Sequence, residues 1–329
     1  MNKFLFLLLP LGSLLPAAHA QHQPNLAAYT LVAADEFNYT SVGQLVAGGM
    51  WRALPEVPAA TYYGYSKTLT PEYELATDNI SVQNGILRLG AKRLAPGDST
   101  ASGKVYTGSA LLMALDIEPQ AGPCDWHPQD WAHGFQFGAV EIRCKLPNTP
   151  QTWPAVWVLS PDTEIDLIDN ASPTPHTRLN SGVLDWRKRN NYYYGADPDN
   201  PPPDPGLDYN TCGGQALSSR DLSQDFTVYT IIWTPEYVTF FVNGEEKYSV
   251  PNEVVRTDYI SVESHPASHC LDQNANHTHK PSYRCTATLR LDMGALAGLA
   301  AEDYLYVDYV KIYKPKPGRK AAGRRATTR

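Results

Sequence analysis

Beyond its first fifteen residues the sequence has no uncharged apolar run approaching the ~20 residues that a transmembrane helix needs. It also lacks any stretch that combines helix caps with a 3.6-residue hydrophobic period, and no internal repeat is evident. These absences exclude an anchor of transmembrane helices, a helical bundle and a repeat architecture. We therefore expect a soluble chain whose fold is neither a helical bundle nor a repeat array.

Basic residues are scarce in the body of the chain. The sequence holds 27 Lys and Arg against 34 Asp and Glu, and seven of the basic residues lie in segment 314–329. An acidic body repels nucleic acid and anionic membranes, so neither is expected as a partner. A neutral polymer remains a suitable ligand, and we expect the protein to be a monomer.

The two ends of the chain differ from its body. Residues 1–20 carry an early Lys3, an apolar run and the small-residue pattern Ala18-His19-Ala20, which is typical of a cleaved secretion signal. We therefore expect a signal peptide at 1–20, one β domain at 21–313 and a basic, disordered tail at 314–329. The mature protein would be secreted, extracellular or periplasmic.

Five cysteines in an exported chain make disulfides chemically available, and the odd number leaves at least one unpaired. Cys270 and Cys285 are the preferred pair because they bracket a polar, His-rich segment, while the pairing of the others stays open. The histidines of that segment have spacings that fit no standard zinc site, so a closed polar loop is the simpler interpretation.

Abundant tyrosine, proline and glycine (20, 27 and 23 residues) suit many short strands joined by turns. Asn243-Gly244 predicts a hairpin within 237–250. The predicted fold class is all-β, an antiparallel β-sandwich of two sheets face to face. Alternating or β-rich segments predict strands at 80–89 (turning at Asn84-Gly85), 139–146, 155–159, 164–168, 228–233, 238–242, 286–291 and 304–313.

The segment Glu-Ile-Asp-Leu-Ile-Asp at 164–169 has chemical interest because it crowds three carboxylates into one strand. Alternation puts Glu164 and Asp166 on one face and the aliphatic residues between them on the other. Carboxylates this close repel one another, so at least one should keep its proton to higher pH. An acid beside a base is what the cleavage of a glycosidic bond requires.

Asp169 breaks the alternation, since simple period 2 would point it into the core. A β-bulge at Leu167-Ile168 would return it to the acidic face. The alternative is that the strand ends at Ile168 and that Asp169-Asn170 opens a turn.

Longer motifs surround this strand. They are Phe-Gly-Ala-Val-Glu-Ile-Arg-Cys-Lys-Leu-Pro at 137–147, Trp-Pro-Ala-Val-Trp at 153–157, Asp-Glu-Phe at 35–37, Asp-Phe-Thr-Val-Tyr at 225–229, Trp-Thr-Pro at 233–235 and Val-Asp-Tyr-Val-Lys-Ile-Tyr at 307–313. In this order they resemble glycoside hydrolase family 16, in its laminarinase-like β-glucanase branch. The resemblance implies a β-jelly roll with a concave glycan-binding cleft and retaining, endo-acting cleavage of β-1,3 or β-1,4 linkages, without a catalytic cofactor.

The resemblance assigns roles to the acidic strand. Glu164 would be the nucleophile, Asp166 would tune and orient it, and Asp169 would take the place of the acid/base, where the family normally has Glu. The shorter Asp predicts a slow site, because a misplacement of about 1 Å can cost roughly 100-fold in rate. Thr227 and Asp185 stand where the family often has His, which also favours altered specificity or weak catalysis.

Aromatic residues are candidates for sugar-stacking platforms. Trp153 and Trp157 share a face of one strand. Trp153 is the preferred platform, and the sequence does not decide whether Trp157 faces the cleft or belongs to the core. Trp186 and Trp51 are weaker loop candidates, and Arg143 of the long motif is a further candidate for substrate binding.

A calcium site is implied on the convex face at Glu36, the Gly85 carbonyl and Asp308, because hard oxygen ligands suit Ca²⁺. The alternative is an unoccupied surface carboxylate pair. For the whole chain, the competing functions are an endo-β-glucanase, most simply on β-1,3(4)-glucan, a glycan-binding protein with a weakened catalytic strand, and a hydrolase of another polymer such as an algal galactan.

Overall fold

The fold is described from a computed structural model that covers residues 23–54, 73–115, 117, 134–159, 163–170, 178–185, 211–217, 221–235, 237–251 and 288–317. The expected signal peptide, Trp186 and the expected pair Cys270 and Cys285 lie outside these residues. Within them, no helix is long and apolar enough to span a membrane.

Strands dominate the described part of the chain, as the sequence predicts. Three short helical elements accompany them: η1 (Leu26–Ala28), α1 (Val42–Ala47) and η3 (Thr77–Asn79). The strands are β1 (Tyr29–Asp35), β2 (Trp51–Leu54), β3 (Tyr73–Leu75), β4 (Ile80–Gln83), β5 (Ile86–Arg93), β6 (Tyr106–Met113), β7 (Gly138–Lys145), β8 (Thr152–Leu159), β9 (Thr163–Asp169), β10 (Arg178–Asp185), β11 (Thr211–Leu217), β12 (Thr227–Trp233), β13 (Tyr237–Val242), β14 (Glu245–Pro251), β15 (Thr288–Ala295) and β16 (Glu302–Pro315).

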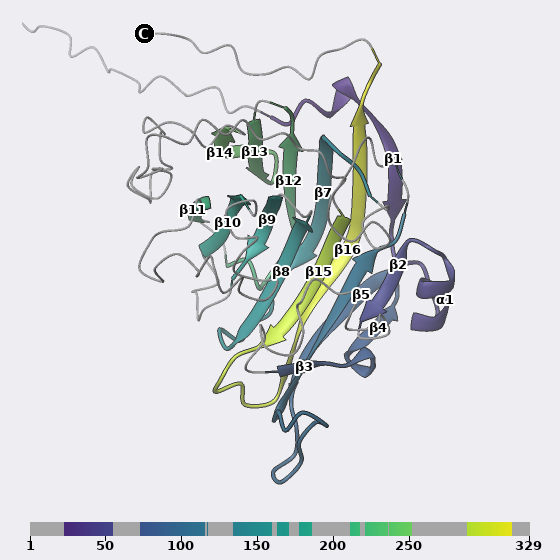
Figure 1. Ribbon diagram of the computed structural model, residues 1–329, viewed down its shortest axis with the longest axis vertical. Helices are drawn as coiled ribbons and strands as arrows, with labels where there is room; N and C mark the ends of the chain where they lie inside the picture. Colours follow the sequence, from purple (N-terminus) through teal and green to yellow (C-terminus); the bar gives the residue numbers. More distant parts are fainter. Residues whose placement is uncertain are drawn as a thin grey trace, which may run out of the picture.

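The strands form one long, curled path in the order β11-β10-β9-β8-β15-β6-β5-β16-β7-β12-β13-β14 (Figure 1). Nearly all pairs are antiparallel; β3 pairs with β6 in parallel. The path folds back between β6 and β5, and β12 reaches β9 from the opposite layer. The expected all-β, jelly-roll fold is therefore confirmed.

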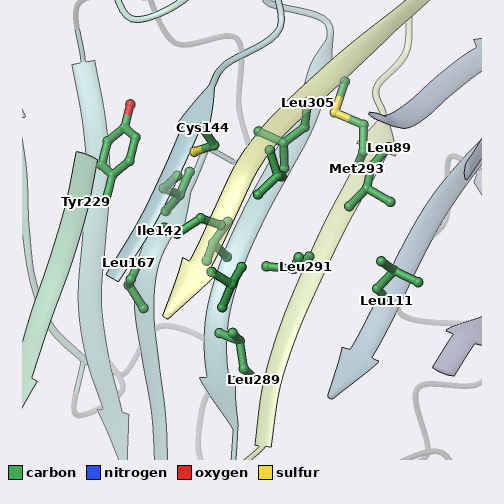
Figure 2. Close-up of a cluster of buried hydrophobic side chains, with 14 of the residues drawn as sticks. Leu89, Leu111, Ile142, Cys144, Leu167, Tyr229, Leu289, Leu291, Met293 and Leu305 are labelled. Carbon is green, nitrogen blue, oxygen red and sulfur yellow. The ribbon is translucent and has the colours of Figure 1, made fainter. Parts of the chain in front are cut away.

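The core lies between the two layers. Figure 2 shows Leu289, Leu291 and Met293 of β15 in one cluster with side chains of the facing layer, such as Ile142 and Cys144 of β7. All five are fully buried. At about 25 cal/mol per Å² of apolar area, burial of this kind is the main force that closes the sandwich. It also fixes which face of each strand is left for chemistry.

Cys144 is a free and buried thiol among the described residues, in agreement with the expectation of at least one unpaired cysteine. It pairs in register with Thr227 of β12, which is also buried on the core side beside Tyr229. Burial raises the pKa of the Cys144 thiol well above its ordinary value. Thr227 therefore lies on the buried, core side of β12.

Two local predictions are confirmed and one boundary moves. Asn84 and Asn243 adopt positive φ before Gly85 and Gly244, which closes the β4–β5 and β13–β14 hairpins. β16 continues through Pro315, so Lys314 belongs to a strand that pairs with β1 and not to the tail. The short helix α1, which the sequence analysis missed, begins after Ser41, whose side chain accepts a hydrogen bond from the Gln44 backbone N–H.

Candidate active site

The acidic strand β9 lies in the middle of one layer, between β8 and β10. Asp166 pairs with Trp157 and Ile168 with Val156, so Leu167 is the extra residue of a β-bulge. Leu167 and Ile168 are both buried in the core. The predicted bulge at Leu167-Ile168 is thus confirmed.

The bulge returns Asp169 to the side of Glu164 and Asp166. Glu164 of β9 pairs with Leu159 of β8, and Asp169 pairs with Ala155. The two paired positions are five residues apart on β9 but four apart on β8, so Asp169 lies on the same side of the sheet as Glu164. We call the side of β9, β8 and β15 that carries these carboxylates the acidic face. At ~3.3 Å per residue the backbone distance between the outer two is ~13 Å, so their carboxyl groups must lean toward each other.

Asp169 is partly exposed and receives a hydrogen bond from Trp153, with 2.7 Å between the indole Nε1 and Oδ1. Burial raises the pKa of the Asp169 carboxyl above its ordinary value, the bond from Trp153 lowers it, and the charge of Asp292 raises it, with a net rise. A raised pKa is what a proton donor needs near neutral pH. The expected acid character of this strand therefore falls on Asp169.

Trp153 and Trp157 lie on the acidic face, as their spacing predicts, and β8 pairs with β15 without a register shift. Trp153 is partly exposed, whereas Trp157 is buried, with 7% of its surface exposed. The Trp157 indole donates to Asp292, with 2.7 Å between Nε1 and Oδ2. Of the two indoles, Trp153 is therefore the more exposed.

The sequence analysis missed two charged residues of this face, Arg290 and Asp292 of β15. Both are 5% exposed. They form a double contact, with Nη2 2.6 Å from Oδ1 and Nε 2.5 Å from Oδ2. The alternation Leu289-Arg290-Leu291-Asp292-Met293 was a readable signal, because the aliphatic members enter the core and the charged members face away from it.

Tyr73 of β3 is a third residue that sequence reasoning missed. Its ring covers two glycines, since a Cβ atom on Gly108 or Gly294 would lie 2.6 Å from it. Burial, followed by the negative charge of Asp292, raises the pKa of the Tyr73 hydroxyl well above its ordinary value. Tyr73 is therefore a neutral wall at the β15 edge of the acidic face.

Two predicted substrate-binding residues lie elsewhere. Trp51 is 1% exposed, packs on Phe37 in the core and donates to Asp35, with 2.8 Å between Nε1 and Oδ2. It presents no face to a sugar, so that prediction is wrong. The Trp51 indole helps to fix the turn that follows β1, where the Asp35 carboxylate also accepts a hydrogen bond from the Phe37 backbone N–H.

Arg143 is also not brought to the acidic strand. It lies on the outer side of β7, whose inner side chains Ile142 and Cys144 belong to the core between the layers. Its guanidinium contacts the Asp308 carboxylate and lies 4.8 Å from the centre of the Phe226 ring. As a substrate-binding residue of the acidic face, Arg143 is a wrong prediction.

The strand register places the three residues of the expected calcium site near one another. β1 ends at Asp35 opposite Val310, and Leu87 of β5 lies opposite Val307, so Glu36 and Gly85 both flank Asp308. A Cβ atom on Gly85 would lie 3.6 Å from the Glu36 carbonyl oxygen. The contact of Asp308 with Arg143 places a competing cation at this corner.

The acidic face can supply what glycosidic cleavage needs. Glu164 and Asp166 are adjacent on one side of β9, burial raises the pKa of the Asp169 carboxyl, and the Trp153 indole donates a hydrogen bond to Asp169. No group of three or more His, Cys, Asp or Glu side chains that could hold a metal ion is present among the described residues.

Comparison with known proteins agrees with this geometry. Residues 132–269 match the model of glycosyl hydrolases family 16. The chain is 25% identical to Glucan endo-1,3-beta-glucosidase A1 of Niallia circulans over 252 residues, which are 70% of this chain and 30% of that protein. It is 25% identical to the Beta-glucanase of Rhodothermus marinus over 248 residues, 68% of this chain and 66% of that one. The match thus spans less than two thirds of either relative.

The laminarinase catalytic domain of Thermotoga maritima has the same fold, with a TM-score of 0.57 at 18% identity over 88% of this chain and 99% of that one. The family motifs of the sequence, the match at 132–269 and this fold agree with one another. Residues 132–269 are therefore similar to glycosyl hydrolases family 16, and the described chain shares the fold of the laminarinase catalytic domain.

Proposed function

We propose that this protein is a secreted, endo-acting β-glucanase that cleaves β-1,3(4)-glucan with retention of configuration at the acidic face. The observation that carries the proposal is the bulge at Leu167, which sets Asp169 beside Glu164 and Asp166 and leaves it partly buried with a raised pKa. The relatives named as a glucan endo-1,3-beta-glucosidase and a beta-glucanase support the choice of polymer.

In the proposed mechanism, a carboxylate oxygen of Glu164 attacks the anomeric carbon while the bond to the leaving sugar breaks. Asp169 gives its proton to the departing glycosidic oxygen, and a covalent glycosyl-enzyme forms. In the second step Asp169, now a carboxylate, takes a proton from water, the water oxygen bonds to the anomeric carbon, and Glu164 leaves. Asp166, buried between them, orients Glu164 and holds a negative charge beside it.

The test is a reducing-end assay of the purified protein on laminarin, lichenan, agarose, carrageenan and xyloglucan, with binding to each polymer measured in parallel. Laminarin or lichenan should gain reducing ends while its viscosity falls early, as endo-cleavage demands. Binding without new reducing ends on any polymer would indicate a glycan-binding protein instead. Cleavage of agarose or carrageenan alone would indicate a galactan hydrolase.

We also propose a structural Ca²⁺ held by Glu36, the Gly85 carbonyl and Asp308, remote from the chemistry. Because Arg143 already contacts Asp308, the ion would have to share that carboxylate or displace the guanidinium. Calcium at about 100 times its Kd should stabilise the fold by about 2.7 kcal/mol and raise Tm relative to EDTA.

The control for calcium is a pair of variants. Asp308→Asn should lose the response, while Asp98→Asn, in an exposed turn, should keep it. Identical melting curves with calcium and with EDTA would remove the site.

A further inference from the structure

The buried Arg290–Asp292 pair has no role in the mechanism above. Replacing a buried ion pair by apolar residues of similar volume is often neutral or stabilising, so the stability of the fold does not explain its presence. Its position on the acidic face calls for another explanation. That explanation lies in the order of strands β9, β8 and β15.

Ala155 of β8 is the centre of the arrangement. It pairs with Asp169 on one side and with Asp292 on the other. Neighbouring strands are ~4.8 Å apart, so the two aspartates sit ~10 Å apart at their backbones with only a methyl group between them. A larger side chain at this position would separate the two carboxyl groups.

The two indoles complete a symmetrical arrangement. Trp153 and Trp157 lie two residues before and two residues after Ala155, on the same face. Trp153 donates its N–H to Asp169 and Trp157 donates its N–H to Asp292, each over 2.7 Å. The guanidinium carbon of Arg290 lies 5.0 Å from the centre of the Trp157 ring. Asp292 is therefore held by Trp157 and Arg290, which also contact each other.

Resting on the proposed function, we propose that Arg290 and Asp292 are positioning residues, which hold a fixed carboxylate behind Asp169 across Ala155 and thereby keep the leaving-group proton on Asp169. The groups that face Asp169 are Glu164 and Asp166 on its own strand, Trp153 on β8, Arg290 and Asp292 on β15, and Tyr73 on β3.

The charges of these groups favour a protonated Asp169. The two ring side chains are neutral, and Arg290 contacts the Asp292 carboxylate through Nη2 and Nε. The other charged side chains named above, all within the part of the chain that the structure describes, are carboxylates. The charge of Asp292 is among the causes that raise the pKa of Asp169, and it also acts on Tyr73.

The sign of the effect follows from which charge is removed. Asp292→Asn removes a negative charge and leaves Arg290 positive, so the midpoint of Asp169 titration should fall by about one pH unit. Arg290→Met leaves the negative charge of Asp292 unbalanced, so the midpoint should rise or stay. The double variant Arg290→Met/Asp292→Leu should fall between the two single variants and keep the buried volume.

The experiment follows the Asp169 carboxyl directly, by ¹³C NMR titration of the protein with labelled aspartate. Asp169→Asn identifies the signal. The alkaline limb of kcat/KM on laminarin, measured in the same variants below their melting temperatures, should move in the same direction as the titration. Asp303→Asn, the same change at a buried aspartate of β16, is the matched control and should leave the midpoint unchanged.

A midpoint that is equal in wild type, Asp292→Asn and the double variant would overturn the inference, because a purely structural pair alters melting but not titration. If no polymer is cleaved, the proposed function fails while the titration still decides the role of the pair. If the midpoint falls in Asp292→Asn as expected, the pair is supported whichever polymer is the substrate.

Discussion

Glu164→Gln should lower turnover of laminarin by about 10⁴-fold or more, while the protein still folds and binds the polymer. The change is isosteric and removes the negative charge that attacks the anomeric carbon. General acid help is worth ~10²–10⁴-fold, and loss of a nucleophile in a serine protease costs about 10⁶-fold, so the loss should lie at or above the upper end of the first range. KM or direct binding should change little, because the amide keeps the size and shape of the carboxyl.

A matched control exists on the other layer. Glu141→Gln makes the same chemical change on the outer side of β7, where the carboxylate accepts a hydrogen bond from the Tyr309 hydroxyl over 3.1 Å. This variant should cleave at nearly the wild-type rate. Turnover of Glu164→Gln within about tenfold of wild type would sink the nucleophile assignment.

The retaining mechanism can be tested through the same residue. In Glu164→Ala, azide ion can enter the space of the missing side chain and attack the anomeric carbon of a glycoside with an activated leaving group. The product would be a glycosyl azide of inverted configuration, since only one displacement occurs. An azide product of retained configuration would identify residue 164 as the acid/base instead.

Much of this site could be predicted from sequence because strand alternation is a local property. Glu164, Asp166 and Asp169 stand in one β-rich segment, and the need to keep Asp169 out of the core predicted the bulge that the structure shows at Leu167. The shared face of Trp153 and Trp157 followed from the same period. Each of these inferences used residues within a single strand.

The predictions that failed concerned residues whose positions depend on contacts between strands distant in sequence. Trp51 was read as a loop residue, but packing on Phe37 and a bond to Asp35 make it part of the core. Arg143 belongs to a family motif next to the catalytic segment in sequence, yet β7 lies in the opposite layer. Motif order does not tell which layer a strand joins.

Arg290 and Asp292 were missed for a different reason. Every residue of β15 is buried, so the face that carries charges is not separated from the core by exposure. Their importance emerges from register, because β15 pairs with β8 so that Asp292 and Asp169 lie on either side of Ala155. The register between strands that are over 120 residues apart cannot be predicted from the sequence of either strand.

Asp169→Asn should lower cleavage of laminarin by ~10²–10⁴-fold, because an amide cannot give a proton to the leaving sugar. On an aryl β-glycoside with an activated leaving group the same variant should lose far less, since that group departs without protonation. The ratio of the two losses is therefore the diagnostic measurement. Comparable losses on both substrates would point to a damaged fold rather than to a missing acid.

Asp169→Glu should raise cleavage of laminarin by about 10- to 100-fold. The longer side chain restores the methylene that the family's usual Glu has, and a misplacement of about 1 Å costs roughly 100-fold. Room for it exists because the residue opposite is Ala155, and the Trp153 indole can follow the carboxyl as a hydrogen-bond donor. Trp153→Phe should keep an aromatic ring at this position but remove the hydrogen-bond donor. Loss of the donor raises the pKa of Asp169 further, so the alkaline limb of the kcat/KM profile should move to higher pH.

The two Asp169 variants must be read together. If Asp169→Glu cleaves laminarin faster and Asp169→Asn cleaves it more slowly but still cleaves the aryl glycoside, Asp169 is a general acid whose side chain is one methylene short and is held by Trp153. A loss with both would mean that the strand has adapted around Asp, so that the extra methylene collides with Asp166 or the sugar. Unchanged cleavage in Asp169→Asn would contradict the assignment altogether, and the proton would then have to come from another carboxyl of the acidic face.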